Sequence, residues 1–280
     1  MTAGVITYTP QLNALVSVRG HPFERDAFGD VFADMEGVAT SFVDQPAASQ
    51  LMNPDSLAAY DALVLYDMPG LDFMHPDAPG YVEPSIGLKE GLAAALDKGI
   101  GVVAMHHAIA GWPAWPEYGD WLGGRFLYRP GDVRGASSPD SGYRHEVTHT
   151  ISASPNLADV FTPLVEGVDA PFQLKDELYL SNVFEDDVFP LWTSDHVFED
   201  RGFYSASLAV QGDMFSNKGW SHPKGSNLVG WVKRAGNSPL VYLQFGDGPE
   251  TYSDPNFKRC IENALHWVAS DAAHEWAKSA

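Results

Sequence analysis

One apolar run that ends in two histidines constrains the fold of this chain more than any other stretch. Residues 100–105 (Ile-Gly-Val-Val-Ala-Met) contain no polar side chain, a pattern typical of a central parallel strand that helices cover on both faces. His106 and His107 follow at the point where this strand should end. Ligands of open α/β sheets bind just beyond the carboxyl ends of strands, so these histidines are the first candidates for chemistry.

Consecutive strand residues point to opposite faces, which limits what the two histidines can do together. Both can serve one site only if the chain turns sharply between them. The alternative is that one of them is structural and hydrogen-bonded to the backbone, because buried polar groups need partners. The sequence leaves open which of His106 and His107 faces the site.

The residues before this run alternate between predicted strands and predicted helices. Gly20 and Pro22 mark a turn after the first strand, and Lys98 and Gly99 are a suitable end for the helix before the run. The alternation predicts a doubly wound α/β fold with a mostly parallel sheet and helices on both faces. By residue range, the predicted strands are 12–18, 38–43 and 62–66, and the predicted helices are 23–35 and 88–96.

The second part of the chain is richer in predicted strands than in helices. Its predicted strands are 143–151, 172–180, 204–210, 226–232 and 239–245, and a predicted helix over 254–269 closes the chain. We expect these strands to extend the parallel sheet with antiparallel neighbours. The first of them alternates, which predicts that His145, Val147 and His149 share one face. Neither a repeat nor a linker is visible in the sequence, so we predict a single domain over residues 1–280.

Charge and cysteine content exclude several classes of protein. The chain has 17 Lys and Arg against 37 Asp and Glu, a formal net charge of -20 that repels nucleic-acid phosphates and anionic membranes. Its single cysteine, Cys260, excludes an intramolecular disulfide framework and a multi-cysteine zinc site. Met1–Pro10 has no secretory-signal pattern, and no apolar run is long enough to span a bilayer. We therefore expect a cytoplasmic protein that binds a small molecule, as a monomer or a homo-oligomer.

Histidines and carboxylates recur at the predicted strand ends and sheet edges. The set comprises His21, Asp67, His106, His107, His145, Asp176 and Glu177. Asp176 falls on the apolar face of its predicted strand with Leu174 and Leu178, where a carboxylate needs a partner or a function. Glu177 falls on the opposite face. Such a set can hold a divalent metal, or it can supply metal-free acid and base groups.

Three tryptophans and a tyrosine lie within ten residues after the histidines, at Trp112, Trp115, Tyr118 and Trp121. Aromatic rings stack on the C–H surfaces of sugars, so this group can form the wall of a carbohydrate site. The alternative is that at least two of these rings pack in the core, as most aromatic side chains do. The candidate substrate-binding residues are therefore His21, Asp67, Trp112 and Trp115.

Several short motifs along the chain resemble those of one known family. They are Gly20–Phe23, Tyr60–Asp67, Gly101–Ala108, Trp115–Tyr118, Gly123–Phe126, His145, Asp176–Tyr179 and Asn263–Val268, and together they span nearly the whole sequence in order. With them the chain resembles the trehalose-utilisation (ThuA-like) proteins of the class I glutamine amidotransferase-like superfold. The resemblance implies a flavodoxin-like sheet and a role in bacterial sugar metabolism.

Two features depart from the pattern that this resemblance implies. Amidotransferases place a cysteine nucleophile at the turn after the central strand, whereas residues 104–110 contain none and Cys260 lies in a predicted helix. Glutamine hydrolysis by a thiol is therefore excluded. Many ThuA-like proteins have a histidine after the glycine that follows the last strand, and here Asp247 follows Gly246.

We interpret the chain as a sugar-processing enzyme, an isomerase or a hydrolase, that acts on a keto-glucoside or a related carbohydrate. The predicted catalytic residues are His107, His145, Asp176 and Glu177, and the predicted ligands, where a zinc, manganese or iron ion takes part, are His106, His107 and His145. The alternative from another class is a carbohydrate-binding protein without catalysis, because a fold does not determine a function. A third reading is a different hydrolase that uses Asp67 or Asp247.

Overall fold

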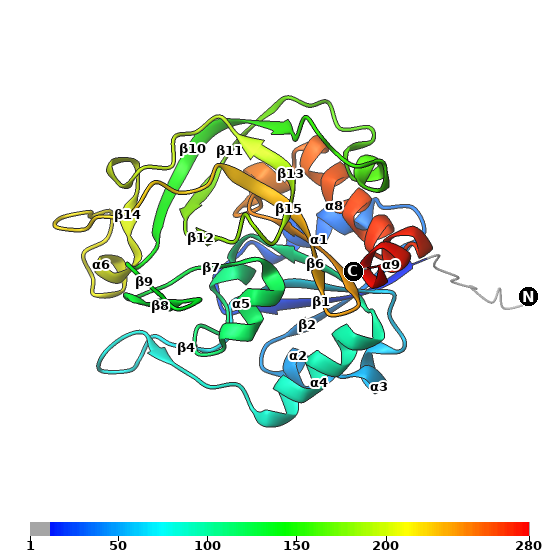
Figure 1. The fold of residues 1–280 in the computed structure, drawn as a ribbon, viewed down its shortest axis with the longest axis horizontal. Coiled ribbons are helices and arrows are strands. Elements are labelled where there is room, and N and C mark those ends of the chain that lie inside the picture. Colours follow the sequence, from blue (N-terminus) through cyan, green and yellow to red (C-terminus); the bar gives the residue numbers. More distant parts are fainter. Residues whose placement is uncertain (1–11, 280) are drawn as a thin grey trace, which may run out of the picture.

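A mixed sheet of ten strands runs through the molecule, and helices cover both of its faces (Figure 1). The computed structural model of the chain describes residues 12–279, so the predictions made for Met1–Pro10 lie outside the described residues. Within 12–279, no helix combines the length and the apolar composition that crossing a bilayer requires.

One part of the sheet is parallel. Its neighbouring strands are, in order, β16 (Ser238–Leu243), β6 (Gly101–Met105), β3 (Ala62–Asp67), β1 (Leu12–Arg19) and β2 (Val38–Asp44). Every residue of β3, β6 and β16 is buried, as expected of strands that are covered on both faces. β6 lies between β3 and β16, so the predicted α/β architecture with this run as a central strand is confirmed.

The other part of the sheet continues from β16 with antiparallel neighbours. In order they are β15 (Leu228–Ala235), β13 (Phe189–Ser194), β10 (Gly142–Ala153) and β11 (Phe172–Leu180), and β14 (Tyr204–Ser205) also pairs with β10. The predicted strand 204–210 is wrong beyond Ser205. The hydroxyl of Ser205 accepts a hydrogen bond from the Leu208 N–H at 3.1 Å and begins the helix α6 (Ala206–Val210). A serine N-cap therefore outweighs the strand propensity of this short apolar run.

Helices form a separate apolar layer on each face of the sheet. One layer contains α1 (Arg25–Ala33), α7 (Pro249–Tyr252), α8 (Pro255–Val268) and α9 (Asp271–Lys278). The other contains α2 (Ala47–Leu51), α3 (Pro54–Leu57), α4 (Ile86–Lys98), α5 (Pro116–Leu122) and α6. Gly99 ends α4 with a φ of 96°, which confirms the helix end predicted there.

Short ribbons and 3₁₀ helices complete the fold. The two-stranded ribbons pair β4 (Leu71–Asp72) with β5 (Gly80–Tyr81), β7 (Gly124–Arg125) with β12 (Asn182–Val183), and β8 (Gly131–Val133) with β9 (Ala136–Ser138). The 3₁₀ helices are His106–Ala110, Asp159–Val165 and Asp200–Gly202.

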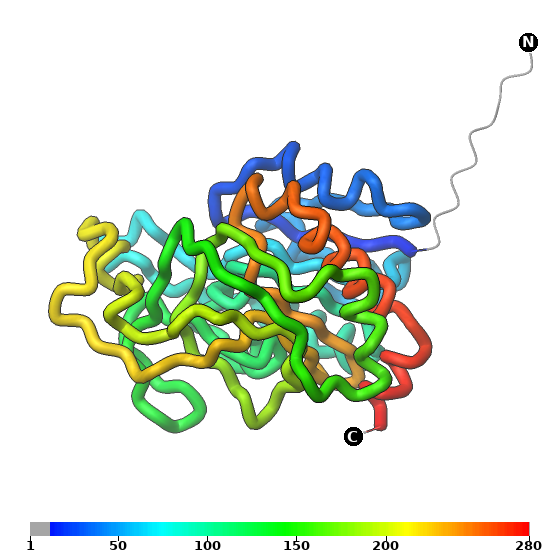
Figure 2. Tube along the Cα trace, turned by 90° about the horizontal axis from the view of Figure 1, so that it is seen from above, coloured from blue at the N-terminus to red at the C-terminus, as the bar shows by residue number. Residues whose placement is uncertain are grey.

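The two parts of the sheet are joined where β15 pairs with β16. Figure 2 shows the N-terminal strands and the C-terminal helices side by side at one end of the molecule, with the segment around α6 at the other end. β16 and its parallel neighbour β6 are the strands of the parallel part that lie nearest to this junction.

Candidate functional site

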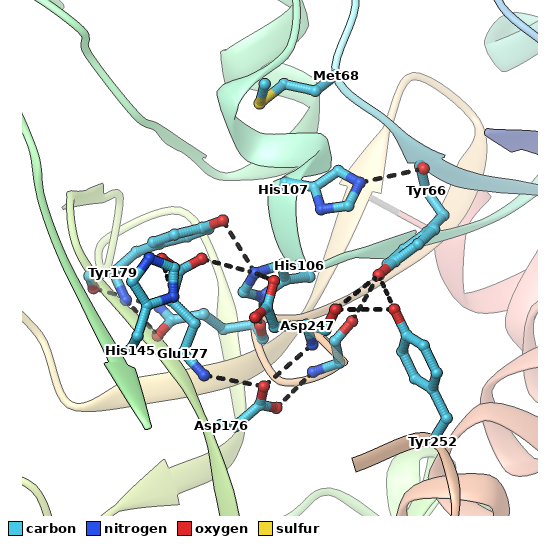
Figure 3. A network of polar contacts seen from close by, with 12 residues as sticks. Tyr66, Met68, His106, His107, His145, Asp176, Glu177, Tyr179, Asp247 and Tyr252 are labelled. Carbon is cyan, nitrogen blue, oxygen red and sulfur yellow. Dashed lines mark hydrogen bonds and ion pairs between the residues drawn. The ribbon is translucent and has the colours of Figure 1, made fainter. Parts of the chain in front are cut away.

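A sharp turn after β6 separates the two adjacent histidines. His106 has a φ of 42°, in the left-handed region that residues other than glycine seldom adopt, and it begins a 3₁₀ helix. The planes of the two imidazole rings are 80° apart, and their centroids are 5.4 Å apart. Figure 3 shows His106 near the carboxylates and His107 near the backbone of Tyr66. The turn therefore gives the two histidines different surroundings.

His106 is fully buried and bonded at both ring nitrogens. Nδ1 donates a hydrogen bond to the Gln244 carbonyl oxygen at 2.5 Å. Nε2 lies 3.1 Å from Glu177 Oε2 and 3.3 Å from Asp247 Oδ1, and the Tyr179 hydroxyl is 2.9 Å away (Figure 3). Because a backbone carbonyl only accepts hydrogen bonds, Nδ1 carries a proton, and Nε2 is the nitrogen that faces the two carboxylates.

The two carboxylates decide the charge of His106. Burial alone would lower the pKa of the ring, but the bonds to Asp247 and Glu177 outweigh burial and hold the pKa well above its ordinary value. Burial acts to raise the pKa of the Asp247 carboxyl, yet the bond to His106 holds that pKa well below its ordinary value. With only these residues present, the ring is an imidazolium shared by two carboxylates.

Glu177 connects this cluster to His145 on the neighbouring strand. Its Oε1 lies 3.1 Å from His145 Nδ1, and the side chain of Glu177 is buried while that of His145 is 38% exposed. The pairing of β10 with β11 is irregular just before Val147, and Glu146 in this bulge has a φ of 56°. A bulge shifts the alternation of the residues that follow it, so His145 shares the face of Tyr143 and Glu177, whereas Val147 turns to the other face. Val147 packs into the opposite core layer, so the predicted common face of His145, Val147 and His149 is wrong for His145.

Asp176 is buried, and its carboxylate binds backbone amides. Its carboxylate accepts hydrogen bonds from the N–H groups of Gly246 at 2.6 Å, Asp247 at 3.0 Å and Glu177 at 2.9 Å. Burial raises its pKa to about 6 in spite of these bonds. The carboxylate on the apolar face of β11 thus has a partner, and it ties that strand to the loop after β16.

His107 lies apart from the carboxylates. Its Nε2 lies 3.2 Å from the Tyr66 carbonyl oxygen, and its ring centroid lies 4.7 Å from that of His21. Burial and the positive charge of His106 lower the pKa of His107 well below its ordinary value, and the same two causes lower that of His21. Both rings are therefore neutral near pH 7. Their buried Nδ1 atoms have no hydrogen-bond partner among the residues that the structure describes.

Two hollows lie against the pair formed by Glu177 and His145. The first, which we call the apolar pocket, has a volume of about 320 Å³, and its lining includes Phe126, Tyr128, Tyr143, Tyr179, Ala209 and Met214. The second, which we call the polar hollow, has a volume of about 170 Å³, and its lining includes Lys175, Asp247, Glu250 and Thr251. Glu177 and His145 line both. The pair therefore lies where an apolar surface meets a polar one.

The predicted substrate-binding residues separate into one that reaches this site and three that do not. His21 lines the apolar pocket. Asp67 is buried elsewhere, where it accepts hydrogen bonds at 2.6 Å from both the Ser17 hydroxyl and the Gln45 amide. Trp115 and Trp112 belong to the core layer that contains α4 and α5. Core packing therefore explains both tryptophans, as the alternative in the sequence analysis has it.

Three side chains have the geometry of a metal site. One ligand atom each from His106, Glu177 and Asp247 lies within 4.8 Å of the others. Two of these separations, 3.1 and 3.3 Å, match the about 3.0–3.4 Å between ligand atoms that surround an ion at the usual bond lengths. The bond from His106 Nδ1 to Gln244 is the second contact that orients a metal-binding histidine. This set shares only His106 with the predicted ligands, since neither His107 nor His145 belongs to it.

Sequence reasoning did not place Asp247, Tyr179 and Gln244 in one site. Tyr179 follows Glu177 by two residues in β11, so strand alternation could have put both on one face. Asp247 follows β16, the parallel neighbour of β6, and the rule that sites form at the carboxyl ends of strands could have found it. The backbone carbonyl of Gln244 leaves no signal in a sequence.

Comparison with known proteins identifies the family. The family model described as ThuA, trehalose utilisation, matches residues 19–268. No curated protein matches the chain.

Solved structures share the fold at low sequence identity. A ThuA-like protein from Parabacteroides merdae has a TM-score of 0.63 at 14% identity, with 93% of this chain and 90% of that chain covered. A ThuA-like protein from Bacteroides uniformis has a TM-score of 0.58 at 16% identity, with 97% and 96% covered. PurLQS from Thermotoga maritima has a TM-score of 0.50 at 14% identity, with 93% and 100% covered. The expected amidotransferase-like fold is thus confirmed, and with the match over residues 19–268 the chain belongs to the ThuA, or trehalose utilisation, family.

Proposed function

We propose that this chain is an enzyme that acts on a keto-glucoside or a related carbohydrate by proton transfer at the cluster of His106, Glu177 and Asp247. The observation that carries the proposal is that Glu177 joins this buried cluster to His145 and lines both hollows. Titratable groups with mutually shifted protonation in a concave site are typical of enzymes. The trehalose-utilisation family supports a carbohydrate as the substrate.

The residues suit three roles in such a reaction. A keto-sugar isomerase or hydrolase needs a base that removes a proton beside the ketone and an acid that protonates an oxygen. Glu177 is the base in this proposal, and His145, bonded to it at 3.1 Å and partly exposed, is the acid. His106 provides fixed positive charge beside the negative charge that develops on the substrate oxygen. His107 supports the turn from behind, because it is fully buried.

The same cluster suits a divalent cation in place of the Nε2 proton. Two carboxylates and one imidazolium leave a net charge of minus one, whereas a divalent ion with a neutral His106 balances both carboxylates. His106, Glu177 and Asp247 would hold the ion, which supplies Lewis-acid polarisation of a substrate carbonyl when it is bound. Elemental analysis of the purified chain for zinc, manganese and iron tests this form. Calorimetric titration of the chelated protein should show an affinity that Asp247→Asn weakens at least about tenfold. If the purified protein neither carries nor binds these ions, the metal-bound form is excluded and only the form with a protonated His106 remains.

The catalytic proposal is tested with a panel of keto-glucosides. We expect Glu177→Gln and His145→Ala each to lower kcat/KM by about 10²–10⁴-fold, because each removes one proton-transfer group. Glu83→Gln is the matched control: its side chain is 67% exposed, it lines neither hollow, and the variant should retain full activity.

Two results would contradict the catalytic proposal. Equal turnover by wild type, Glu177→Gln and His145→Ala would show that proton transfer occurs elsewhere. Saturable sugar binding without conversion by the wild type, with the His145 variant binding normally, would instead identify a carbohydrate-binding protein on this fold.

A further inference from the structure

The apolar pocket is poorly suited to a sugar ring. Its wall contains three tyrosines, but their hydroxyls already have partners within the protein. That of Tyr128 donates to the Met68 sulfur at 2.9 Å, that of Tyr143 accepts from the Phe215 N–H at 3.1 Å, and that of Tyr179 contacts His106. Apart from His21, His145 and Glu177, the lining offers few free hydrogen-bonding groups to a polyhydroxylated ring, and buried hydroxyls without partners are unfavourable.

The polar hollow has the opposite character. Lys175, Asp247 and Glu250 line it together with Glu177 and His145. Charged and hydroxyl-bearing side chains of this kind pair with sugar hydroxyls. Because Glu177 and His145 line both hollows, a ligand beside this pair would meet polar groups on one side and an aromatic wall on the other.

Apolar side chains also remain exposed around the apolar pocket. Phe73 is 46% exposed and Met214 is 50% exposed, and both line the pocket. Phe215, 57% exposed, packs its ring against those of Tyr143 and His145. Large apolar side chains gathered at the surface mark a binding site, and methionine adapts to ligands of different outline.

We propose that the substrate is a glycoside with an aromatic aglycone. The sugar occupies the polar hollow, the aromatic ring occupies the apolar pocket, and the bond between them lies beside Glu177 and His145. The volume of about 320 Å³ is at the small end of the range for small-molecule sites, which suits one substituted ring. This inference rests on the proposed function, because it names the class of carbohydrate derivative that the same site accepts.

Binding measurements test the inference without relying on turnover. The probes are phenyl and methyl glucosides, each as the α and the β anomer, together with trehalose, and calorimetry with the full chain measures their affinities. We expect the better phenyl glucoside to bind at least about tenfold more tightly than the methyl glucoside of the same anomer, because only the phenyl ring fills the apolar wall. Trehalose should bind more weakly than the phenyl glucoside, because its second sugar carries hydroxyls.

Variants of residues that line the apolar pocket test whether the phenyl ring binds there. Ala209→Phe fills the apolar pocket, so it should abolish the preference for phenyl over methyl while the affinity for the methyl glucoside stays the same. Met214→Gln changes a half-exposed side chain without risk to the fold and should reduce the preference at least about threefold. Gln211→Ala, on an exposed residue just after α6, is the control and should change neither affinity.

The outcomes separate this inference from the proposed function. Equal affinities for phenyl and methyl glucosides, or trehalose binding as tightly as the phenyl glucoside, would overturn the aromatic aglycone. If the Ala209→Phe variant still prefers the phenyl glucoside, the placement of the aromatic ring in the apolar pocket is overturned. The loss of keto-glucoside turnover in Glu177→Gln is measured independently, so catalysis can stand when the aglycone fails. A phenyl preference without any turnover would support the pocket and contradict catalysis.

Discussion

The parallel and antiparallel parts of the sheet contribute different things to the site. The parallel part supplies the buried histidines at the end of β6 and the loop with Asp247 after β16. The antiparallel part supplies Glu177 from β11 and His145 from β10. The parallel part alone would give His106 only one of its two carboxylates, Asp247. The comparison indicates that the antiparallel strands complete the cluster with Glu177 and His145.

The two parts also differ in how their strands are exposed. β3, β6 and β16 are buried throughout, whereas β10 has buried, half-buried and exposed residues in irregular succession. β10 lies between β11 and β13, and its bulge before Val147 separates the face of His145 and Glu177 from the face of Val147. The buried strand β6 therefore holds His106, and β10 and β11 present His145 and Glu177 to the two hollows.

The largest expected effect tests whether the two parts unfold together. Trp231 of β15 is fully buried, stacks on Tyr242 of β16 with a centroid distance of 4.3 Å, and donates to the Leu122 carbonyl oxygen at 2.7 Å. Trp231→Ala should lower the free energy of unfolding by about 3–5 kcal/mol in a single urea transition. Met74→Ala, at a side chain that is 92% exposed, should change it by less than about 0.5 kcal/mol. Two separate transitions would show that the parts are independent.

An effect of intermediate size is expected from His149 in the antiparallel part, which should make the free energy of unfolding decrease at acid pH. His149 of β10 is buried against the Ser194 hydroxyl of β13 at 2.8 Å, and burial lowers its pKa from 6.5 to about 4. Between these values the unfolded chain binds a proton that the folded chain does not. Stability from this residue is therefore fully present above pH 6.5 and decreases by about 1.4 kcal/mol per pH unit as the pH falls toward 4.

His149→Gln should remove that part of the pH dependence. Urea unfolding of wild type and variant is compared at about pH 8, where His149 is neutral in both states, and again at about pH 5. The stability difference between the two proteins should shift in favour of the variant as the pH falls. A difference that is the same at both pH values would place the acid sensitivity outside His149.

The smallest expected effect on the free energy of unfolding concerns α8, a helix that packs on the parallel part of the sheet. Asp254 caps α8, where its carboxylate accepts hydrogen bonds from the N–H groups of Asn256 at 2.8 Å and Phe257 at 3.1 Å. Asp254→Ala should lower the free energy of unfolding by about 1 kcal/mol, and Asp254→Asn should restore most of it, because asparagine also caps. Equal losses in both variants would show that charge at the helix end matters more than the cap itself.

The sequence predicted the parallel part well because its signals are local. The apolar run before His106 became β6, and the expected strand 62–66 lies within β3. In the antiparallel part, the expected strand 172–180 coincides with β11. The faces of Asp176 and Glu177 followed from alternation. The predicted strand 204–210 was wrong because one serine hydroxyl caps a helix there. The predicted common face of His145 and Val147 was wrong because a bulge lies between them. The contact distances around His106 could not be predicted, since even its bond to Glu177 joins residues that are 71 positions apart in the chain.

Asp247 departs from the pattern that the family resemblance implies, and the structure shows what this residue contacts. The position after Gly246 carries Asp247 instead of the histidine expected there, and its carboxylate lies 3.3 Å from His106 Nε2. A histidine in that place would add positive charge beside an imidazolium, whereas the aspartate neutralises it.

One buried carboxylate has a consequence for anyone who wishes to redesign this protein. The Asp176 carboxylate accepts hydrogen bonds from the backbone N–H groups of Glu177, Gly246 and Asp247. These bonds help to fix the spacing of the two carboxylates that contact His106, those of Glu177 and Asp247. New specificities are therefore better sought by varying Met214 and Ala209 in the lining of the apolar pocket, because neither accepts or donates any of these hydrogen bonds of Asp176. Laboratory evolution should accept changes at Met214 or Ala209 far more readily than any replacement of Asp176.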